Sequence, residues 1–228
     1  MQAMGSGIYD PWGLTQLSIS FNLEDRSIFQ KFSKLSSLSI PKTVQNEIES
    51  CTTSLQKWYE SVPQHLQWNT PVAPPHRRPI CHLHLRYFNT IIFSTRHVLL
   101  TDVQSVCSDQ GDFKLSSLGQ LCLDACEQSL SILDLMQSSN NLSSMTVVDT
   151  KSIIDIAMVF LLVLTRWQNA RLQGFLDRCT EFLQGMDDVG FCKFAKRDLA
   201  MVVEMYNARY RSAHGSAEVP TGQEWTYQ

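Results

Sequence analysis

Charged residues are scarce in this sequence. Asp, Glu, Lys and Arg make up only 18% of its 228 residues, against roughly 25% in typical soluble domains. No run of Lys or Arg is long enough to form a phosphate-binding stripe, and the formal net charge is −3. We therefore expect no direct binding of nucleic acid by this chain.

Motifs for metal, redox or nucleophilic chemistry are also missing. The seven cysteines contain no C-x-x-C, so neither a zinc knuckle nor a thioredoxin-type pair is predicted. The spacing in "CLDAC" (Cys122 and Cys126) suits a packed pair of reduced thiols better than half of a metal site. No Gly-rich nucleotide loop, H-E-x-x-H, Ser–His–Asp order or paired-carboxylate motif occurs. The sequence thus assigns no catalytic residue, cofactor or metal, and it leans away from an enzyme.

Long apolar runs and targeting signals are absent as well. The longest apolar run, 156–164, is far shorter than the roughly 18 residues of a membrane span. The first residues, "MQAMGSGIYDPWG", are polar and Gly-rich and do not form a signal peptide. These features predict an intracellular protein of the nucleus or cytoplasm, without a membrane partner.

What the sequence does contain is helical periodicity, and no strand-like alternation of convincing length accompanies it. Prolines bound several periods, and the proline-rich "NTPVAPPHRRP" (69–79) predicts an extended connector. We expect an all-α fold, a single irregular array of about six to eight helices over 28–211. A mostly irregular segment, 1–27, precedes it, and a mobile tail, 212–228, follows. The predicted helices are about 28–38, 44–59, 79–100, 116–136, 149–169, 172–184 and 189–211.

The helix predicted at 79–100 carries an H-x-H pattern in "CHLHLRY". On a strand, residues two apart share a face, but on a helix they are rotated by about 200°. Apolar residues fill one half of the helical wheel, with His84 and Tyr87 among them, and His82 falls on the opposite, solvent half. The two histidines therefore do not form a metal site. His84 is either a neutral, hydrogen-bonded core residue or a polar group lining an internal pocket.

Two charged residues of the most apolar predicted helix, 149–169, complete the candidate set. Asp155 either lies near the helix N-terminus, where the helix dipole favours a carboxylate, or faces a partner inside the domain. The sequence favours the first alternative. Arg166 closes the same helix, where a cation is the ordinary arrangement. If the fold encloses a pocket, we expect His84, Tyr87, Asp155 and Arg166 to line it.

The segments "LQKWYESVPQHL" (55–66) and "HLHLRYFNTIIFSTRHVLL" (82–100), separated by the proline-rich spacer, carry a family pattern. They resemble the fungal-specific transcription factor domain, the middle homology region of fungal zinc-cluster regulators. That family shows Leu-x-x-Trp, Leu-Pro and Leu, then a Leu-His-x-x-Tyr helix that ends in Arg-Pro. Val62 replaces the family's leucine, and His97 its proline. The matching positions are Leu55, Trp58, Val62, Pro63, Leu66, Leu83, His84, Tyr87 and Arg96.

The resemblance covers about 28–210, since "CLDACEQSLSILDLM" and "DIAMVFLLVL" are also similar to later helices of that region. It corresponds to the second half of the family's domain. Neither the first half, with its Phe-Trp segment, nor the six-cysteine zinc cluster is found in these 228 residues. The resemblance implies a regulatory module that binds a protein partner or a small-molecule effector, without reading DNA itself.

Two further functions stay open. The scaffold can instead serve as a stand-alone enzyme or small-molecule-binding protein of fungal secondary metabolism. An enclosed helical pocket catalyses rearrangement or cyclisation through shape and positioning, which leaves no sequence motif. The last alternative is a purely structural interaction domain, and a homodimer is compatible with each function.

Overall fold

The computed structural model describes residues 42–105, 115–143, 146–167 and 169–214, with side chains up to 208. These residues belong to one compact unit that begins at Lys42. All regular secondary structure within the described ranges is helical, which confirms the predicted all-α class. The predicted helix 28–38, the segment 1–27 and most of the predicted tail lie outside the described residues.

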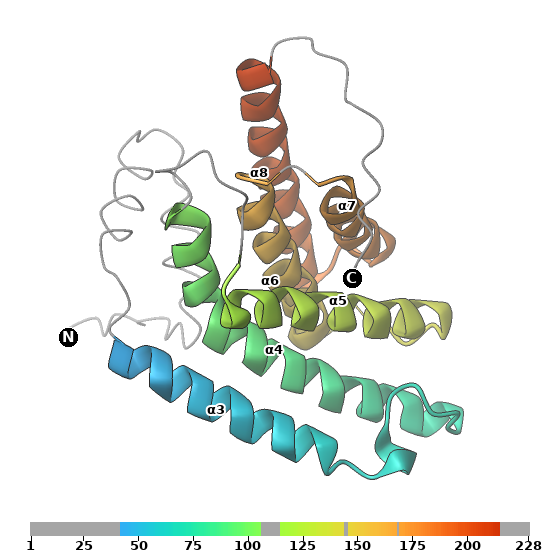
Figure 1. The fold of residues 1–228 in the computed structure, drawn as a ribbon. Coiled ribbons are helices and arrows are strands. Elements are labelled where there is room, and N and C mark those ends of the chain that lie inside the picture. The colour runs from blue at the N-terminus through green and yellow to red at the C-terminus, as the bar shows by residue number, and fades with distance from the viewer. Residues whose placement is uncertain (1–41, 106–114, 144–145, 168, 215–228) are drawn as a thin grey trace, which may run out of the picture. The chain divides into compact units, whose positions relative to one another are not determined.

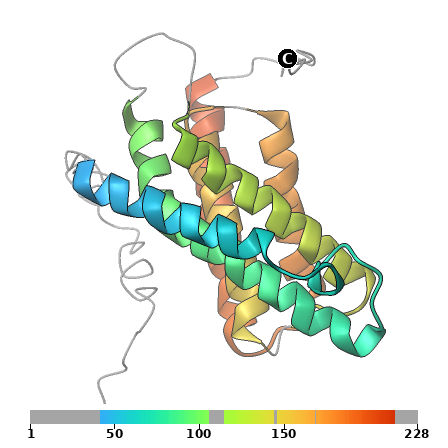
Figure 2. The ribbon, with the colours of Figure 1, turned by 60° about the horizontal axis from the view of Figure 1, so that its bottom comes forward.

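Six α-helices and one short 3-10 helix make up the described fold, and α4 is at its centre. α4 packs most extensively on α5 and also contacts α3 and α6, while α6 packs on α7 and α8. Figures 1 and 2 show α3, α4 and α5 side by side, with α6, α7 and α8 crossing them. The elements are α3 (Lys42–Glu60), η1 (Gln64–Leu66), α4 (Pro74–Ser105), α5 (Ser117–Ser138), α6 (Val147–Leu164), α7 (Ala170–Gly185) and α8 (Gly190–His214).

α4 is longer than predicted, since it begins at Pro74 and ends at Ser105. The extended connector expected over 69–79 is therefore wrong for its second half. Pro74 and Pro75 occupy the first helical positions, where a backbone N–H has no partner and a missing one costs nothing. Pro79 lies inside the helix and lacks the N–H that would bond the Pro75 carbonyl. The added turns place two arginines, Arg77 and Arg78, on α4.

α6 ends earlier than predicted, at Leu164. Arg166 therefore does not close the helix as expected, and it lies exposed in the turn that follows. The chain turns here because Asn169 caps the next helix, its Oδ1 accepting the Arg171 N–H at 2.8 Å. An N-cap needs extended backbone, which the helix cannot continue through. No helix among the described residues has the length and apolar character to cross a membrane.

The predicted inner face of the helix at 116–136 is confirmed, since all six of its residues are buried: Leu118, Cys122, Ala125, Ser129, Ile132 and Met136.

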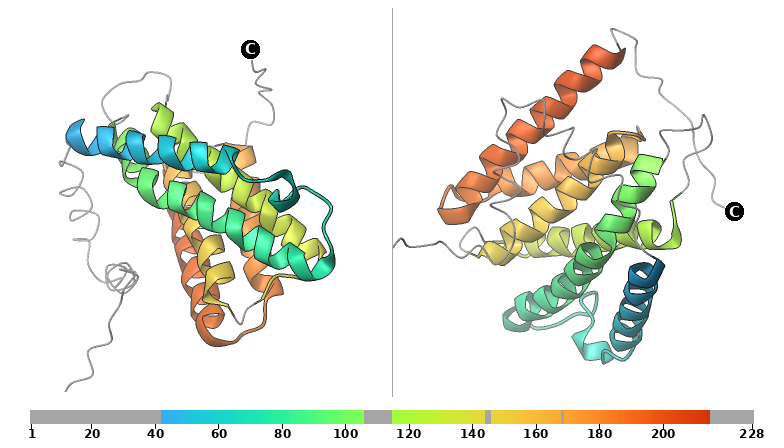
Figure 3. Two further views of the ribbon diagram at one scale, coloured as in Figure 1. Left: turned by 90° about the horizontal axis from the view of Figure 1, so that it is seen from below. Right: turned by 90° about the vertical axis from the view of Figure 1, so that its left-hand side faces the viewer.

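α3 is covered much less, because it packs mainly against α4. Thr52 is its only buried residue. Ile48, Leu55 and Tyr59 are half-buried in phase with it. Figure 3 shows α3 along one side of α4.

The thiols expected in the core are there. Cys81, Cys122, Cys126, Cys179 and Cys192 are buried, and of the described cysteines Cys51 alone is exposed. Burial raises the pKa of the Cys179 thiol to about 12, despite the charge of Arg178 nearby. These side chains act as small apolar groups within the helical core.

Candidate functional site

His84 is fully buried and satisfied at both ring nitrogens. Its Nε2 lies 2.8 Å from the Leu66 carbonyl oxygen and its Nδ1 lies 3.2 Å from the Tyr59 hydroxyl. Burial lowers the pKa of His84, although the bond to Leu66 opposes this, so the imidazole is neutral near pH 7. Because a carbonyl only accepts, Nε2 carries the proton and Nδ1 accepts from the Tyr59 O–H. The prediction that His84 points inward is confirmed.

Aromatic rings surround His84 and leave it in a packed cluster. The Tyr59 ring stacks on Tyr87, with ring centroids 4.2 Å apart, and meets His84 edge-on at 5.3 Å. Trp58 and Phe88 complete the cluster, at 5.9 Å from Tyr87 and 5.6 Å from Tyr59. His84 and Tyr87 thus come together as predicted, but as core residues of the α3–α4 contact.

The other two predicted pocket residues lie elsewhere. Asp155 is half-buried in the middle of α6 and pairs with Lys151, one turn earlier on the same helix. The favoured position near the helix N-terminus is therefore wrong; of the two alternatives, a partner inside the domain is the one that fits, and that partner is Lys151 of the same helix. No hydrogen bond or ion pair between described residues joins Asp155 or Arg166 to His84 or Tyr87. The four predicted residues do not form one site.

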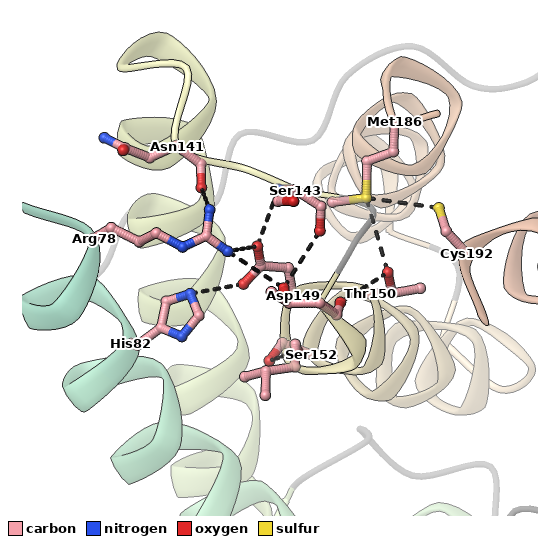
Figure 4. Close-up of polar contacts among 11 residues, drawn as sticks. Arg78, His82, Asn141, Ser143, Asp149, Thr150, Ser152, Met186 and Cys192 are labelled. Carbon is pink, nitrogen blue, oxygen red and sulfur yellow. Dashed lines mark hydrogen bonds and ion pairs between the residues drawn. The ribbon is translucent and has the colours of Figure 1, made fainter. Parts of the chain in front are cut away.

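The N-terminal carboxylate of α6 is Asp149, whose side chain is fully buried. Two side chains of α4 bind it: Arg78 Nη2 lies 2.8 Å from Oδ2, and His82 Nε2 lies 2.8 Å from Oδ1. The Ser143 N–H donates to Oδ2 at 3.0 Å. We call this group, Arg78, His82, Ser143 and Asp149, the Asp149 clasp (Figure 4). It joins α4 to the first turn of α6.

The start of α4 also holds the connector between α5 and α6. Arg78 donates to the Asn141 carbonyl and, at 3.3 Å, to the Thr146 hydroxyl. Arg77 donates to the Ser139 hydroxyl at 3.1 Å. Two neighbouring arginines therefore bind three points of one connector, which Figure 4 shows in part.

The electrostatics of the clasp keep Asp149 ionised. Burial alone would raise the pKa of Asp149, but the hydrogen bond and charge of His82, together with Arg78, outweigh it and lower the pKa below its ordinary value. The helix dipole adds to this at the first turn of α6. His82 Nε2 and Asp149 Oδ1 face each other at 2.8 Å, and neither atom has another polar partner among the described residues.

His82 corrects one prediction, because it does not point to solvent. Its side chain is only 21% exposed and faces α6. A second polar contact follows on the same side of α4, where Asn89 Nδ2 donates to the Ser152 hydroxyl at 2.7 Å. Ser152 in turn donates to the Val148 carbonyl at 2.8 Å. The polar half of the predicted α4 wheel is thus partly an interface with α6.

Sequence reasoning missed the clasp, although two signals for it exist. Arg78 and His82 are four residues apart, which places them on one face of a helix. Thr146 and Asp149 have the spacing of a helix N-terminal capping pattern. The first signal was hidden because the proline-rich stretch predicts extended chain at Arg78. The second was hidden because Asp155 was predicted to be the carboxylate near the N-terminus of this helix, whereas Asp149 occupies that position.

Two surface hollows lie near these contacts. One, of about 430 Å³, lies between η1, the connector that follows it and the first turns of α4, where Leu66, Val72 and Ile80 line it. The other, of about 310 Å³, lies between the α5–α6 connector and the end of α7, with Leu142 and Phe182 in its wall. Neither hollow is lined by the four predicted pocket residues.

The two segments that carry the family resemblance meet in space. Trp58 and Leu66 belong to the first segment, His84 and Tyr87 to the second, and the contacts described above join them. Comparisons with models of protein families, with curated proteins and with solved structures found no match for this chain. The arrangement of these residues is therefore the basis for a functional proposal.

Proposed function

We propose that this chain is a helical regulatory module of the kind that the resemblance to the fungal-specific transcription factor domain implies. It acts in the nucleus or cytoplasm by binding a protein partner or a small effector. The observation that carries the proposal is the contact between the two segments that carry the family resemblance. We call this contact, made by Tyr59, Leu66 and His84, the joint. Leu66, after the Leu-Pro-like turn, accepts the hydrogen bond of His84 from the Leu-His-x-x-Tyr helix.

This joint gives the family pattern a physical reason. A buried imidazole needs a partner for each nitrogen, and the first segment supplies both through Tyr59 and Leu66. Pro63 precedes η1 and sets the turn that brings the Leu66 carbonyl to the helix. Trp58 and Tyr87 pack beside the bond. A sequence that keeps both halves of the pattern keeps this contact, which supports a shared fold.

Two exposed aromatic side chains on the surface favour binding of a protein partner. Phe93 on α4 and Phe194 on α8 are 60% and 55% exposed. An arginine lies over each ring, Arg96 at 4.6 Å from the Phe93 centroid and Arg197 at 5.7 Å from that of Phe194. Aromatic residues and arginine are enriched in protein interfaces. We assign Phe93 to the partner-binding surface, because α4 is also the helix of the family pattern.

The test uses the source organism. In a deletion strain, transcripts of a defined gene set should fall several-fold. A Phe93→Asp strain should reproduce the fall, and a Thr90→Asp strain should not, because Thr90 is an exposed residue one turn away on the same helix. Protein levels are matched by immunoblot. Unchanged transcripts in the deletion strain would refute the regulatory function.

The alternative, a stand-alone enzyme of secondary metabolism, has one observation in its favour. Asp149 holds the His82 imidazole at 2.8 Å, and a carboxylate that orients an imidazole is a common part of general-base sites. If this alternative holds, a His82→Gln strain accumulates one intermediate at unchanged transcript levels. An Asp155→Asn strain, which alters a carboxylate outside the clasp, serves as the control.

A further inference from the structure

The hollow beside η1 combines an apolar lining with two solvent-exposed histidines. Its volume of about 430 Å³ falls within the range of roughly 300–1,000 Å³ seen for small-molecule sites. Leu66, Val72 and Ile80 supply apolar surface. His65 and His76 line it too, and neither side chain makes a hydrogen bond or ion pair with a described residue.

The segments that form the hollow carry no acidic residue, since no Asp or Glu occurs from 61 to 101. Arg77 lies in the same turns of α4, while the charge of Arg78 is paired with Asp149. The first turn of α4 carries no acidic residue. An anion at the hollow therefore meets no carboxylate from the segments that form it, and it lies near the positive end of the α4 dipole.

We propose that this hollow binds a small organic carboxylate with an apolar body. The apolar body covers Leu66, Val72 and Ile80, and the carboxylate accepts N–H hydrogen bonds from His65 and His76. An imidazole keeps at least one N–H donor in either protonation state. The inference names the effector class of the function proposed above, and its physiological meaning rests on that function.

Leu66 connects the hollow to the buried joint. It lines the hollow, and its carbonyl oxygen lies 2.8 Å from His84 Nε2. A ligand that contacts both Leu66 and Ile80 bridges η1 and α4. The hydrogen bond of His84 joins the same two elements. Because it binds the folded state only, it also raises stability in proportion to its concentration over its dissociation constant.

The test titrates the full chain with sodium 4-phenylbutyrate as the probe and with 4-phenylbutan-1-ol as its uncharged match. Histidine ring resonances are followed by NMR, and the heat of binding by calorimetry. We expect saturable shifts of the His65, His76 and His84 rings. Hydrogen bonds to a charged group contribute about 1.5–3 kcal/mol, so the alcohol should bind at least about tenfold more weakly. Absence of saturable shifts, or equal affinity for the alcohol, overturns the proposal.

Variants locate the site. Ala73 lines the hollow and is exposed, so Ala73→Phe should fill it and abolish binding without disturbing the core. Ala200→Phe makes the same change at an exposed position of α8 and should leave binding intact. The double variant His65→Ala, His76→Ala removes both N–H donors and should weaken binding of the carboxylate more than binding of the alcohol. Probe binding that survives Ala73→Phe overturns the proposed location.

The binding test and the transcript test fail independently. Probe binding that follows the variants, with unchanged transcripts in the deletion strain, keeps the site and rejects the regulatory function. A transcript response without probe binding rejects the site and keeps the regulatory function.

Discussion

Two histidines of α4, two residues apart, are held in opposite ways. His84 is fully buried, neutral and bonded to uncharged groups, the Tyr59 hydroxyl and the Leu66 carbonyl. His82 keeps a fifth of its side-chain surface in solvent and faces the ionised, fully buried Asp149 at 2.8 Å, with Arg78 beside it. His84 thus belongs to an aromatic contact between α4 and α3, whereas His82 belongs to an electrostatic contact between α4 and α6.

The difference shows what each contact depends on. At the α3 side, the loss of His84 removes two hydrogen bonds and leaves a space among aromatic rings. At the α6 side, the loss of Asp149 leaves Arg78 and His82 facing a closed interface without an opposite charge. Breaking a buried ion pair costs more than removing a neutral pair, because an uncompensated charge stays behind.

The largest effect is therefore expected for Asp149→Ala. This variant removes the carboxylate that Arg78, His82 and the Ser143 N–H share, which should lower the free energy of unfolding by about 3 kcal/mol. The matched control is Asp155→Ala, which removes a half-buried pair within one helix and should cost about 0.5 kcal/mol. Urea denaturation measures both. Equal losses of unfolding free energy would show that the Asp149 clasp stabilises the fold no more than the Lys151–Asp155 pair does.

The next effect is expected for His84→Ala, at about 2–3 kcal/mol from the lost hydrogen bonds and the cavity among the rings. His97→Ala, at an exposed position of the same helix, should stay within about 0.5 kcal/mol. Near-ultraviolet circular dichroism should report loosened Tyr59 packing in the first variant alone. A larger loss for His84→Ala than for Asp149→Ala reverses the ranking of the two contacts.

A third anchor of α4 sharpens the comparison, because no basic residue of the described part of the chain pairs with its carboxylate. Asp102 Oδ2 accepts from the Ser116 N–H at 3.0 Å and from the Ser116 hydroxyl at 2.7 Å. A Cβ added at Gly119 would lie 2.3 Å from that oxygen. Gly119→Ala should therefore destabilise by about 1 kcal/mol, although alanine favours helix. Gly174→Ala, with nothing within 4 Å, should instead stabilise by up to about 1 kcal/mol, and thermal unfolding compares the two.

The smallest effect, up to about 1 kcal/mol, concerns pH. Burial lowers the pKa of His84 below its ordinary 6.5, so the unfolded chain binds more protons just below that pH. The stability that His84 contributes is complete above about 6.5 and is lost as the pH falls. The pKa of His97 is lowered in the same direction by partial desolvation and by Arg96, but His97 is exposed, so its share is smaller. Asp149 keeps its contribution until more acidic conditions, because its pKa is lowered from 3.8.

The measurement for this last prediction is the unfolding free energy of wild type and His84→Gln between about pH 5 and 8. The difference between them should shrink on acidification. A His84 difference that grows toward low pH would mean that the folded state holds this imidazole charged.

The parts of this fold that follow one periodic face were predictable from the sequence. The helix at α5, its buried face and the inward position of His84 follow from apolar spacing alone. The Asp149 clasp was not predictable in this way, because α4 is buried on three sides. A helical wheel with one apolar face assigns His82 and Asn89 to solvent, whereas both face α6.

Local chemistry explains the remaining differences. Arg78 was hidden by the four prolines of 69–79, which predict extended chain, although two of them suit the start of a helix. Arg166 was predicted to close α6, but the helix already ends at Leu164, and Asn169 caps the next helix shortly after. In both places a short-range backbone preference decides the structure, and the hydrophobic period does not reveal it.

The distribution of buried thiols offers a way to observe motion in this fold. Cys81 belongs to α4, Cys122 and Cys126 to α5, Cys179 to α7 and Cys192 to α8. A buried thiol reacts with a reagent only when its helix opens to solvent. With Cys51 and Cys107 replaced by serine, the order in which the remaining thiols react under native conditions ranks these helices by how often each one leaves the core.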